Sequence, residues 1–238
     1  MLFGRRWVPA LTPLVFMVAL NAGLGRAAVV FSNGTFAPGT WTAPQKVGNG
    51  SVSSSQVVAG GNPGEYLRVD HLNFSYVPIV FHYPTGATYS PSVQGAIDTA
   101  SWSINKIAIL NFDPYGVAVA GALLQNGQTC FPTLQLDSDI SWVTLSGTSL
   151  TAADFSTRDN ASAHPDFSAT GSQIQIGFVT ANDNTNRTAS RAAGFDNWPV
   201  TVNQSETSPV PEPSALLLPG SGLAGIIETG AQAGSRAW

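Results

Sequence analysis

Gln173-Ile-Gln-Ile-Gly-Phe-Val179 is the stretch that decides the fold of this chain. Its apolar residues Ile174, Ile176 and Phe178 stand at every second position, with polar or small residues between them. Successive side chains of a β-strand point to opposite faces, so this period of two predicts a strand with one buried and one solvated face.

The rest of the chain between the termini repeats this strand pattern. The same alternation occurs at 133–137 and 200–202, whereas 77–83 and 104–111 are more continuously apolar, as strands covered on both faces would be. Asn126-Gly127, between the apolar runs 118–124 and 129–136, is the strongest hairpin signal. Further turn signals fall at 60–64, 84–86 and 113–116.

Helical signals are short. Thr151-Ala-Ala-Asp154 resembles a capping box, with Asp in place of the usual Glu, and predicts one brief helix. Roughly ten strands in about 180 residues predict an all-β fold, a two-sheet antiparallel β-sandwich of the jelly-roll kind.

The low content of charged residues and the single cysteine limit the kinds of partner that the chain is expected to bind. Charged residues make up 10% of the chain, against about 25% in ordinary globular proteins, and the formal net charge is −4. No basic patch is visible, so nucleic acid is excluded as an expected partner. Cys130 is the single cysteine, which excludes a disulfide framework and predicts a small buried apolar side chain.

The N-terminal residues 1–27 have the features of a secretory signal peptide. Arg5 and Arg6 supply a positive start, 8–20 is apolar, and Gly25-Arg26-Ala27 offers the small residues that a signal peptidase requires. The apolar part is short for a membrane span and contains two prolines, which favours a cleaved signal.

The C-terminal stretch 210–227 begins with Pro211, Glu212 and Pro213 and continues into small and aliphatic residues. This arrangement resembles the PEP-CTERM sorting signal of bacterial exported proteins. The resemblance implies transient anchoring in the inner membrane, processing by an exosortase-type enzyme, and release to the cell surface or extracellular matrix. The alternative is a Pro-rich linker with an apolar end.

The tail departs from the family pattern at its end. Pro219 interrupts the apolar run, and Arg236 stands alone where the family carries an arginine cluster, so positive-inside anchoring is weak. We therefore predict three parts: a signal peptide at 1–27, a β-sandwich ectodomain at 28–207, and a PEP-CTERM-like tail with a degenerate end at 208–238.

Three local motifs carry a second resemblance. Phe31-Ser-Asn-Gly-Thr-Phe36 followed by Trp41 is similar to the opening strand of carbohydrate-binding jelly-roll modules. The segment 61–67 resembles a turn and strand of laminin-type sandwiches, and 194–202 looks like the closing strand of such ectodomains and binding modules. The resemblance implies that the first and last strands lie side by side and bring Asn33 near Asp196.

The same resemblance implies a candidate ion site. Jelly-roll modules often hold a structural calcium where the first and last strands meet, bound by carbonyl groups and a carboxylate. Asp196 would supply the carboxylate and Asn33 a carbonyl. The alternative is that Asp196-Asn197 makes a turn or bulge hydrogen bond to its own backbone. No other cofactor is indicated.

Catalytic motifs are absent from the sequence, which contains no nucleophile elbow, zinc-binding helix motif, phosphate loop or dinucleotide fingerprint. His82 lies in an apolar run and is expected to be a core histidine. Asp137 and Asp139 would point to one face of a strand and could form an acidic pair for a polysaccharide hydrolase or lyase. The favoured interpretation is two turn or edge aspartates.

Aromatic residues are the remaining ligand candidates. Tyr83, Tyr89 and Tyr115 lie beside turn signals and are expected to be exposed for contact, and Trp41 could stack on a sugar ring. Trp102, Trp142 and Trp198 could join Trp41 in such a platform, although core packing is expected for each of the four tryptophans.

The leading hypothesis is an exported, non-catalytic module at the cell surface or in the extracellular matrix, which binds exopolysaccharide or has a structural role there. A polysaccharide-acting lyase or hydrolase on a jelly-roll scaffold is the alternative. A matrix or adhesion subunit that recognises protein is a third.

Overall fold

The computed structural model describes residues 28–205, except for 48–49, 75–77, 111–115 and 183–187. The signal peptide and sorting tail thus lie outside the described residues. No helix in the described part of the chain is long and apolar enough to cross a membrane.

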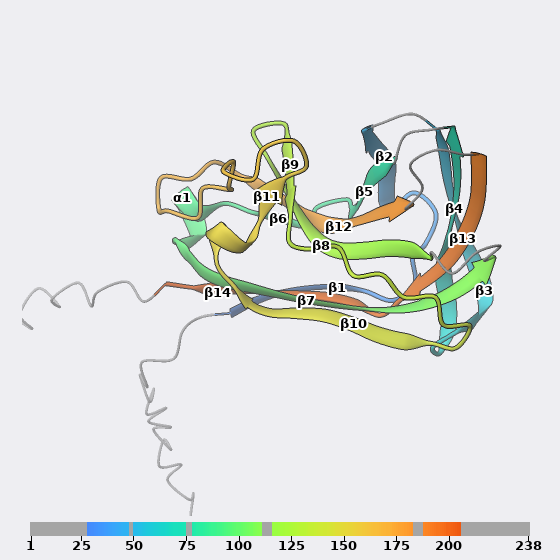
Figure 1. Ribbon diagram of the computed structural model, residues 1–238. Coiled ribbons are helices and arrows are strands. Elements are labelled where there is room, and N and C mark those ends of the chain that lie inside the picture. The colour runs from blue at the N-terminus through green and yellow to red at the C-terminus, as the bar shows by residue number, and fades with distance from the viewer. Residues whose placement is uncertain (1–27, 48–49, 75–77, 111–115, 183–187, 206–238) are drawn as a thin grey trace, which may run out of the picture. The chain divides into compact units, whose positions relative to one another are not determined.

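Two seven-stranded antiparallel sheets pack face to face (Figure 1). Sheet 1 runs in the order β1-β14-β7-β13-β4-β3, with β10 paired to β7. Sheet 2 runs in the order β11-β9-β8-β12-β5-β2, with β6 paired to β12. The strands of sheet 1 are β1 (Ala28–Asn33), β3 (Ser51–Gly61), β4 (Gly64–Phe74), β7 (Ile97–Leu110), β10 (Val143–Leu150), β13 (Thr188–Asp196) and β14 (Trp198–Gln204). Those of sheet 2 are β2 (Trp41–Val47), β5 (Ile79–Pro84), β6 (Thr88–Tyr89), β8 (Val117–Gln125), β9 (Gln128–Phe131), β11 (Ser156–Thr157) and β12 (Ile174–Asn182).

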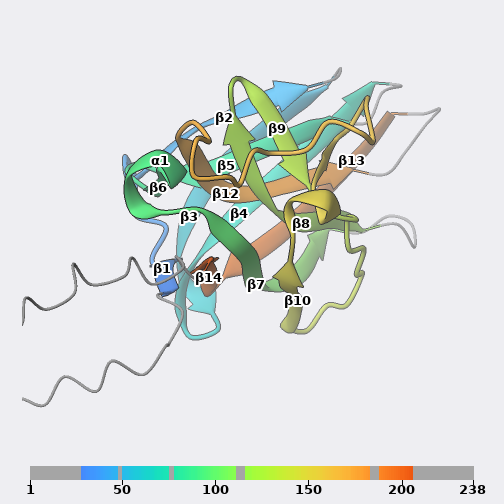
Figure 2. The same ribbon diagram turned by 90° about the vertical axis from the view of Figure 1, so that its left-hand side faces the viewer.

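The chain passes repeatedly between the two sheets, as in a jelly roll. The successive strand pairs β4 and β5, β7 and β8, and β12 and β13 each change sheet, and Figure 2 shows the two layers from the side. The first strand β1 pairs with the last strand β14, from Ala28 opposite Asn203 to Asn33 opposite Trp198. The predicted fold class and the predicted adjacency of the terminal strands are confirmed.

The apolar core lies between the sheets. In β12, Ile174, Ile176 and Phe178 are buried as predicted, but the expected solvated face is wrong, because every residue of β12 except half-buried Gln175 is buried. Strand β8 is likewise buried on both faces along most of its length. The sheets approach closely at Gly121 of β8, where an added Cβ would lie 2.6 Å from Trp102 Cδ1. Glycine is therefore required there by space.

Local signals set the turns. Asn126 and Gly127 both have positive φ, 51° and 77°, and connect β8 to β9 as the type I′ hairpin signal predicts. The capping box at Thr151 is present and starts the short 3₁₀-helix η1 (Ala152–Asp154). The other short helix is α1 (Pro91–Gln94).

The strand predicted at 133–137 is wrong. Only one bridge forms there, between Val119 and Gln135. The segment instead crosses to the other sheet, because Asp139 O accepts a hydrogen bond from Ala108 N at 2.7 Å. Lys106 Nζ also donates to Asp137 O. The alternating segment therefore contacts sheet 2 at Gln135 and sheet 1 at Asp137 and Asp139, so it does not form a strand of either sheet.

Candidate binding site

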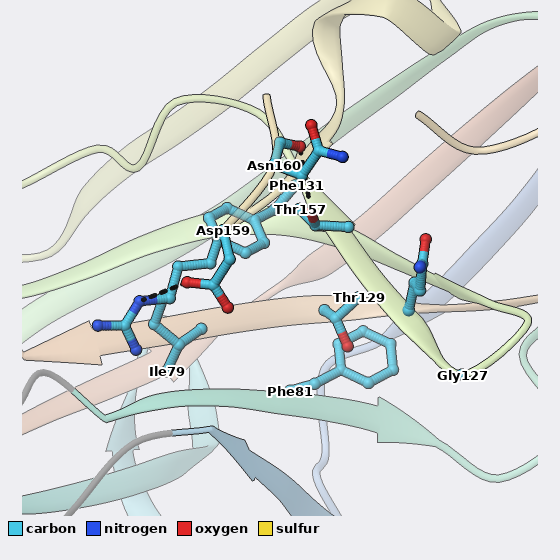
Figure 3. Close-up of a pocket in the computed structure, with 10 residues that line it drawn as sticks. Ile79, Phe81, Gly127, Thr129, Phe131, Thr157, Asp159 and Asn160 are labelled. Atoms are coloured by element: carbon cyan, nitrogen blue, oxygen red, sulfur yellow. Dashed lines mark hydrogen bonds and ion pairs between the residues drawn. The ribbon is translucent and has the colours of Figure 1, made fainter. Parts of the chain in front are cut away.

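A pocket of about 350 Å³ lies over sheet 2 (Figure 3). We call it the sheet-2 pocket. Strands β5 and β9 and the loop after β11 supply its walls, which are Ile79, Phe81, Gly127, Gln128, Thr129, Phe131, Thr157, Arg158, Asp159 and Asn160. Pockets of about 300–1,000 Å³ are typical of small-ligand sites.

The strand register places the pocket on the outer face of sheet 2. Gly121 of β8 faces the core and is opposite Phe178, whereas Phe81 is opposite Val179, one position along. Successive residues alternate between faces, so Phe81 lies on the face of sheet 2 that points away from sheet 1, where it is buried. Thr129 is opposite Leu124 by the same register and shares that outer face.

Two strands separate the pocket's aromatic residues. Phe81 lies on β5 and Phe131 on β9, and β8 and β12 between them give a span of about 14 Å. The Phe81 ring lies over Gly177, whose added Cβ would be 2.9 Å from Phe81 Cε2, and it stacks on Tyr83 at 5.0 Å. Phe81 is only 1% exposed, whereas Phe131 is half-buried and presents the more accessible ring.

The loop after β11 forms a polar rim. Thr157 Oγ1 donates to Asn160 O at 3.1 Å, and Asn160 Oδ1 accepts from Ser162 N at 2.9 Å. Arg158 Nε lies 3.9 Å from Asp159 Oδ1, so the two charges of the rim lie together. With Gln128 and Thr129, the pocket offers mainly amide and hydroxyl groups beside an aromatic ring.

This chemistry suits binding better than hydrolysis. Glycoside hydrolysis uses two carboxyl groups across one bond, and Asp159 is the single carboxylate among the lining residues. The predicted acidic pair lies elsewhere, where Asp137 Oδ1 accepts a hydrogen bond from Asp139 N at 2.7 Å. Both carboxylates lie near buried Lys106, whose pKa is lowered to about 8 by burial and partly restored by these two charges.

The three tyrosines predicted to be exposed for ligand contact differ in their burial. Tyr83 is half-buried on the outer face of sheet 2 and stacks on Phe81 beside the pocket. Tyr89 is 0% exposed and donates from its hydroxyl to Gly95 O at 2.8 Å, so its predicted exposure is wrong. Its position beside a turn did not reveal that the ring enters the core. Tyr115 lies outside the described residues.

Trp41 belongs mainly to the core. It stacks on Phe36 at 4.9 Å and meets Trp198 edge-on at 5.5 Å. It is distant in sheet order from the β9 side of the sheet-2 pocket. As expected, Trp102, Trp198 and Cys130 are buried. The core prediction for Trp142 is wrong, because this ring is half-buried and donates from Nε1 to Gly60 O at 3.2 Å.

Asp196 lies near the turn that follows Asn33, and Asn33 pairs with Trp198, two positions after Asp196. An added Cβ on Gly34 would lie 4.0 Å from Asp196 Oδ1. Asp196 is buried, and its two carboxylate oxygens accept hydrogen bonds from Asn62 N at 2.5 Å and from Asn197 N at 2.7 Å. The bond from Asn197 N is the local hydrogen bond to the backbone that the alternative interpretation predicts. Asn33 Oδ1 accepts from the next turn at Phe36 N, 2.8 Å away.

These contacts fit a hydrogen-bonded turn better than an ion site. Calcium takes six to eight oxygen ligands, and here one carboxylate already receives two N–H donors. No group of three or more His, Cys, Asp or Glu side chains that could hold a metal occurs in the described ranges. Structural calcium stays a prediction.

Two histidines form a buried bridge between the sheets. His71 of β4 and His82 of β5 each place Nε2 2.9 Å from Thr180 Oγ1 of β12. Burial lowers the pKa of each histidine to about 3. His82 is thus the hydrogen-bonded core histidine that the sequence predicts.

Comparison with known proteins bears on the fold. No protein-family model matches the chain, and no curated protein matches its sequence. Among solved structures, the chain is similar to a family 11 carbohydrate-binding module of Clostridium thermocellum, in complex with a β-1,3-1,4-mixed-linked tetrasaccharide. That match has 12% identity, a TM-score of 0.44, and coverage of 74% of this chain and 96% of the other. It is also similar to the CBM22-1 xylan-binding domain from Paenibacillus barcinonensis, with 13% identity, a TM-score of 0.40, and coverage of 76% and 97%. Similarity at this level does not locate a ligand site in this chain.

The lining of the sheet-2 pocket was not predicted from the sequence. Thr129 and Phe131 fall only in the second strand of the predicted hairpin, 129–136, Gln128 falls in the connection before it, and 157–160 carries no signal. The alternation at 128–131 could have shown that Thr129 and Phe131 share a face. It could not have shown that this face meets Phe81, almost fifty positions earlier in the chain.

Proposed function

We propose that this chain is a non-catalytic carbohydrate-binding module of an exported protein, with its glycan site in the sheet-2 pocket. The observation that carries the proposal is the combination of the accessible Phe131 ring with uncharged hydrogen-bonding groups around one concave space. A sugar presents apolar C–H faces and many hydroxyl groups, and these two kinds of surface complement such a lining.

The energetics favour a neutral glycan. Burying a hydroxyl without a partner is costly, so a sugar site must offer donors and acceptors close together. Gln128 provides them on the strand side, and Thr157 and Asn160 do so on the loop side. The adjacent charges of Arg158 and Asp159 offset each other, so the rim does not select strongly for an ionic ligand.

The proposed location rests on the termini. The signal peptide at 1–27 and the motif Pro211-Glu212-Pro213 support export, transient inner-membrane anchoring and processing by an exosortase-type enzyme. A glycan-binding module released there would associate with exopolysaccharide at the cell surface or in the matrix.

Calorimetric titration of the full-length protein with a panel of soluble bacterial and plant polysaccharides tests the site. We expect Phe131→Ala to weaken binding at least tenfold, through loss of the stacking surface. Gln128→Ala removes one hydrogen-bonding group at an exposed position, and we expect about fivefold weaker binding.

Thr148→Ala is the matched control. Thr148 is exposed on β10 in the opposite sheet, so binding should be unchanged. Binding that survives both pocket substitutions would place the glycan elsewhere, and no binding across the panel would overturn the proposed function. Melting curves of each variant separate loss of binding from loss of folding.

A further inference from the structure

Strand β3 (Ser51–Gly61) is an open edge of sheet 1. It has 11 residues and pairs with β4 alone among the described strands. Its ladder with β4 is regular from Ser51 opposite Leu72 to Val57 opposite Tyr66 and then shifts register. An edge strand presents a row of unpaired N–H and C=O groups that can pair with another strand.

The regular segment 51–57 of this edge lacks two of the features that normally prevent such pairing, a charged residue and a proline. The whole sequence of β3, Ser-Val-Ser-Ser-Ser-Gln-Val-Val-Ala-Gly-Gly, contains no charged residue and no proline. The edge strand of sheet 2, β2 (Trp41–Val47), contains both Pro44 and Lys46. Proline and lysine are the residues that protect edges against association. These two edge strands, one from each sheet, therefore differ in kind.

A groove beside β3 gives the edge a second feature of an interface. It has a volume of about 710 Å³ and lies between β3 and the segment 36–42. The stacked rings of Phe36 and Trp41 line it together with Leu67, and buried Trp41 Nε1 has no hydrogen-bond partner. An added strand would extend sheet 1 and place its inward side chains over this groove.

The occupant that fits is a second copy of the same strand. Ser54 is at the middle of the regular segment 51–57. In an antiparallel pair related by a two-fold axis at Ser54, Ser53 faces Ser55 and Val52 faces Gln56 of the other copy. All of these residues are uncharged and small or medium in size, so no like charges oppose each other. A two-fold contact also closes on itself and gives a dimer.

We propose that β3 is a dimerisation edge, at which two copies of this chain pair antiparallel about Ser54 and join their first sheets into one continuous sheet. The sheet-2 pocket remains free in this arrangement, because none of its lining residues belongs to β3 or to the segment 36–42. The dimer presents two such pockets and so increases avidity for a repeating polymer.

Sedimentation velocity of the full-length protein over a range of concentrations tests the proposal. We expect a dimer for the wild type. Ser54→Lys and Ser54→Glu each place like charges opposite one another across the axis, and each should give a monomer. An equimolar mixture of the two variants should restore a dimer, because opposite charges then face each other.

Ser146→Lys is the matched control, since Ser146 is exposed on β10 of the same sheet and does not lie on β3. It should remain dimeric. A wild type that is monomeric at every concentration, a Ser54→Lys variant that stays dimeric, or a mixture that fails to reassociate would each overturn the proposal. A monomer that binds an unrelated extended peptide would assign the edge to a different partner.

Discussion

Acid pH should destabilise this fold through two buried histidines. His71 and His82 are 1% and 2% exposed, and both bond to Thr180 Oγ1. One hydroxyl can donate to only one ring nitrogen, so at least one of the two histidines donates to it. Protonation of both rings would leave the hydroxyl with two donors and no acceptor.

The direction of the effect follows from the pKa values. Desolvation lowers the pKa of both histidines in the folded state to about 3, below the value of about 6.5 expected in the unfolded chain. Asp70 partly opposes the shift at His71, whereas Arg191 adds to it. The unfolded chain therefore takes up protons first, and stability falls as pH drops from about 6.5 towards 3.

The magnitude is large on the scale of a domain. A pH of 5 is about 1.5 units below the pKa of each histidine in the unfolded chain. This difference lowers the free energy of unfolding by about 2 kcal/mol for each histidine. The two together remove about 4 kcal/mol, compared with a total stability of about 5–15 kcal/mol for ordinary domains.

Urea unfolding at pH 7.5 and at pH 5.0 gives the free energy of unfolding of each protein at both pH values, and the difference between the two is the loss. In the wild type this free energy should fall by about 4 kcal/mol from pH 7.5 to pH 5.0. In His71→Gln and in His82→Gln it should fall by about 2 kcal/mol less, because one of the two histidines is gone. His164→Gln, at an exposed position, should behave as the wild type does. Equal losses in the wild type and in both core variants would refute the reasoning, whatever their stability at pH 7.5.

Three further predictions concern close packing, the terminal-strand turn and sorting. Gly121→Ala should lower the free energy of unfolding by about 1–3 kcal/mol, because the new methyl group meets Trp102; urea unfolding measures this. Asp196→Ala should cost about 1–3 kcal/mol, because buried N–H groups lose their acceptor. If calcium binds there, its addition raises the wild-type melting midpoint and EDTA reverses the rise, with neither effect in the variant. Replacing Pro211-Glu212-Pro213 by three alanines should retain the protein in the membrane fraction of its host, whereas unchanged release would contradict the sorting interpretation.

Local patterns predicted local structure well. Asn126-Gly127 forms the expected hairpin because positive φ at two successive residues is a property of those residues and their turn. The capping box at Thr151 formed for the same kind of reason. Patterns that depend on a distant partner failed, as at 133–137, where the alternating residues reach one sheet at Gln135 and the other at Asp139.

Side-chain exposure was the least predictable property. Tyr83 and Tyr89 both stand near the turn at 84–86, yet Tyr83 is half-buried on an outer face and Tyr89 is fully buried. Position relative to a turn does not fix the side of the strand on which a ring falls. Register does fix it, and register is set by pairing with β12.

The sequence alone determined the strand-rich composition, the two-sheet sandwich, the tight turns and the low charge, because these depend on residue type and on a period of two. Tertiary structure alone decided the histidine bridge and the sheet-2 pocket. His71 and Thr180 are 109 positions apart in sequence, and Phe81 and Phe131 stand on strands separated by two others. No local pattern encodes such meetings, because they arise only when two sheets have formed and packed.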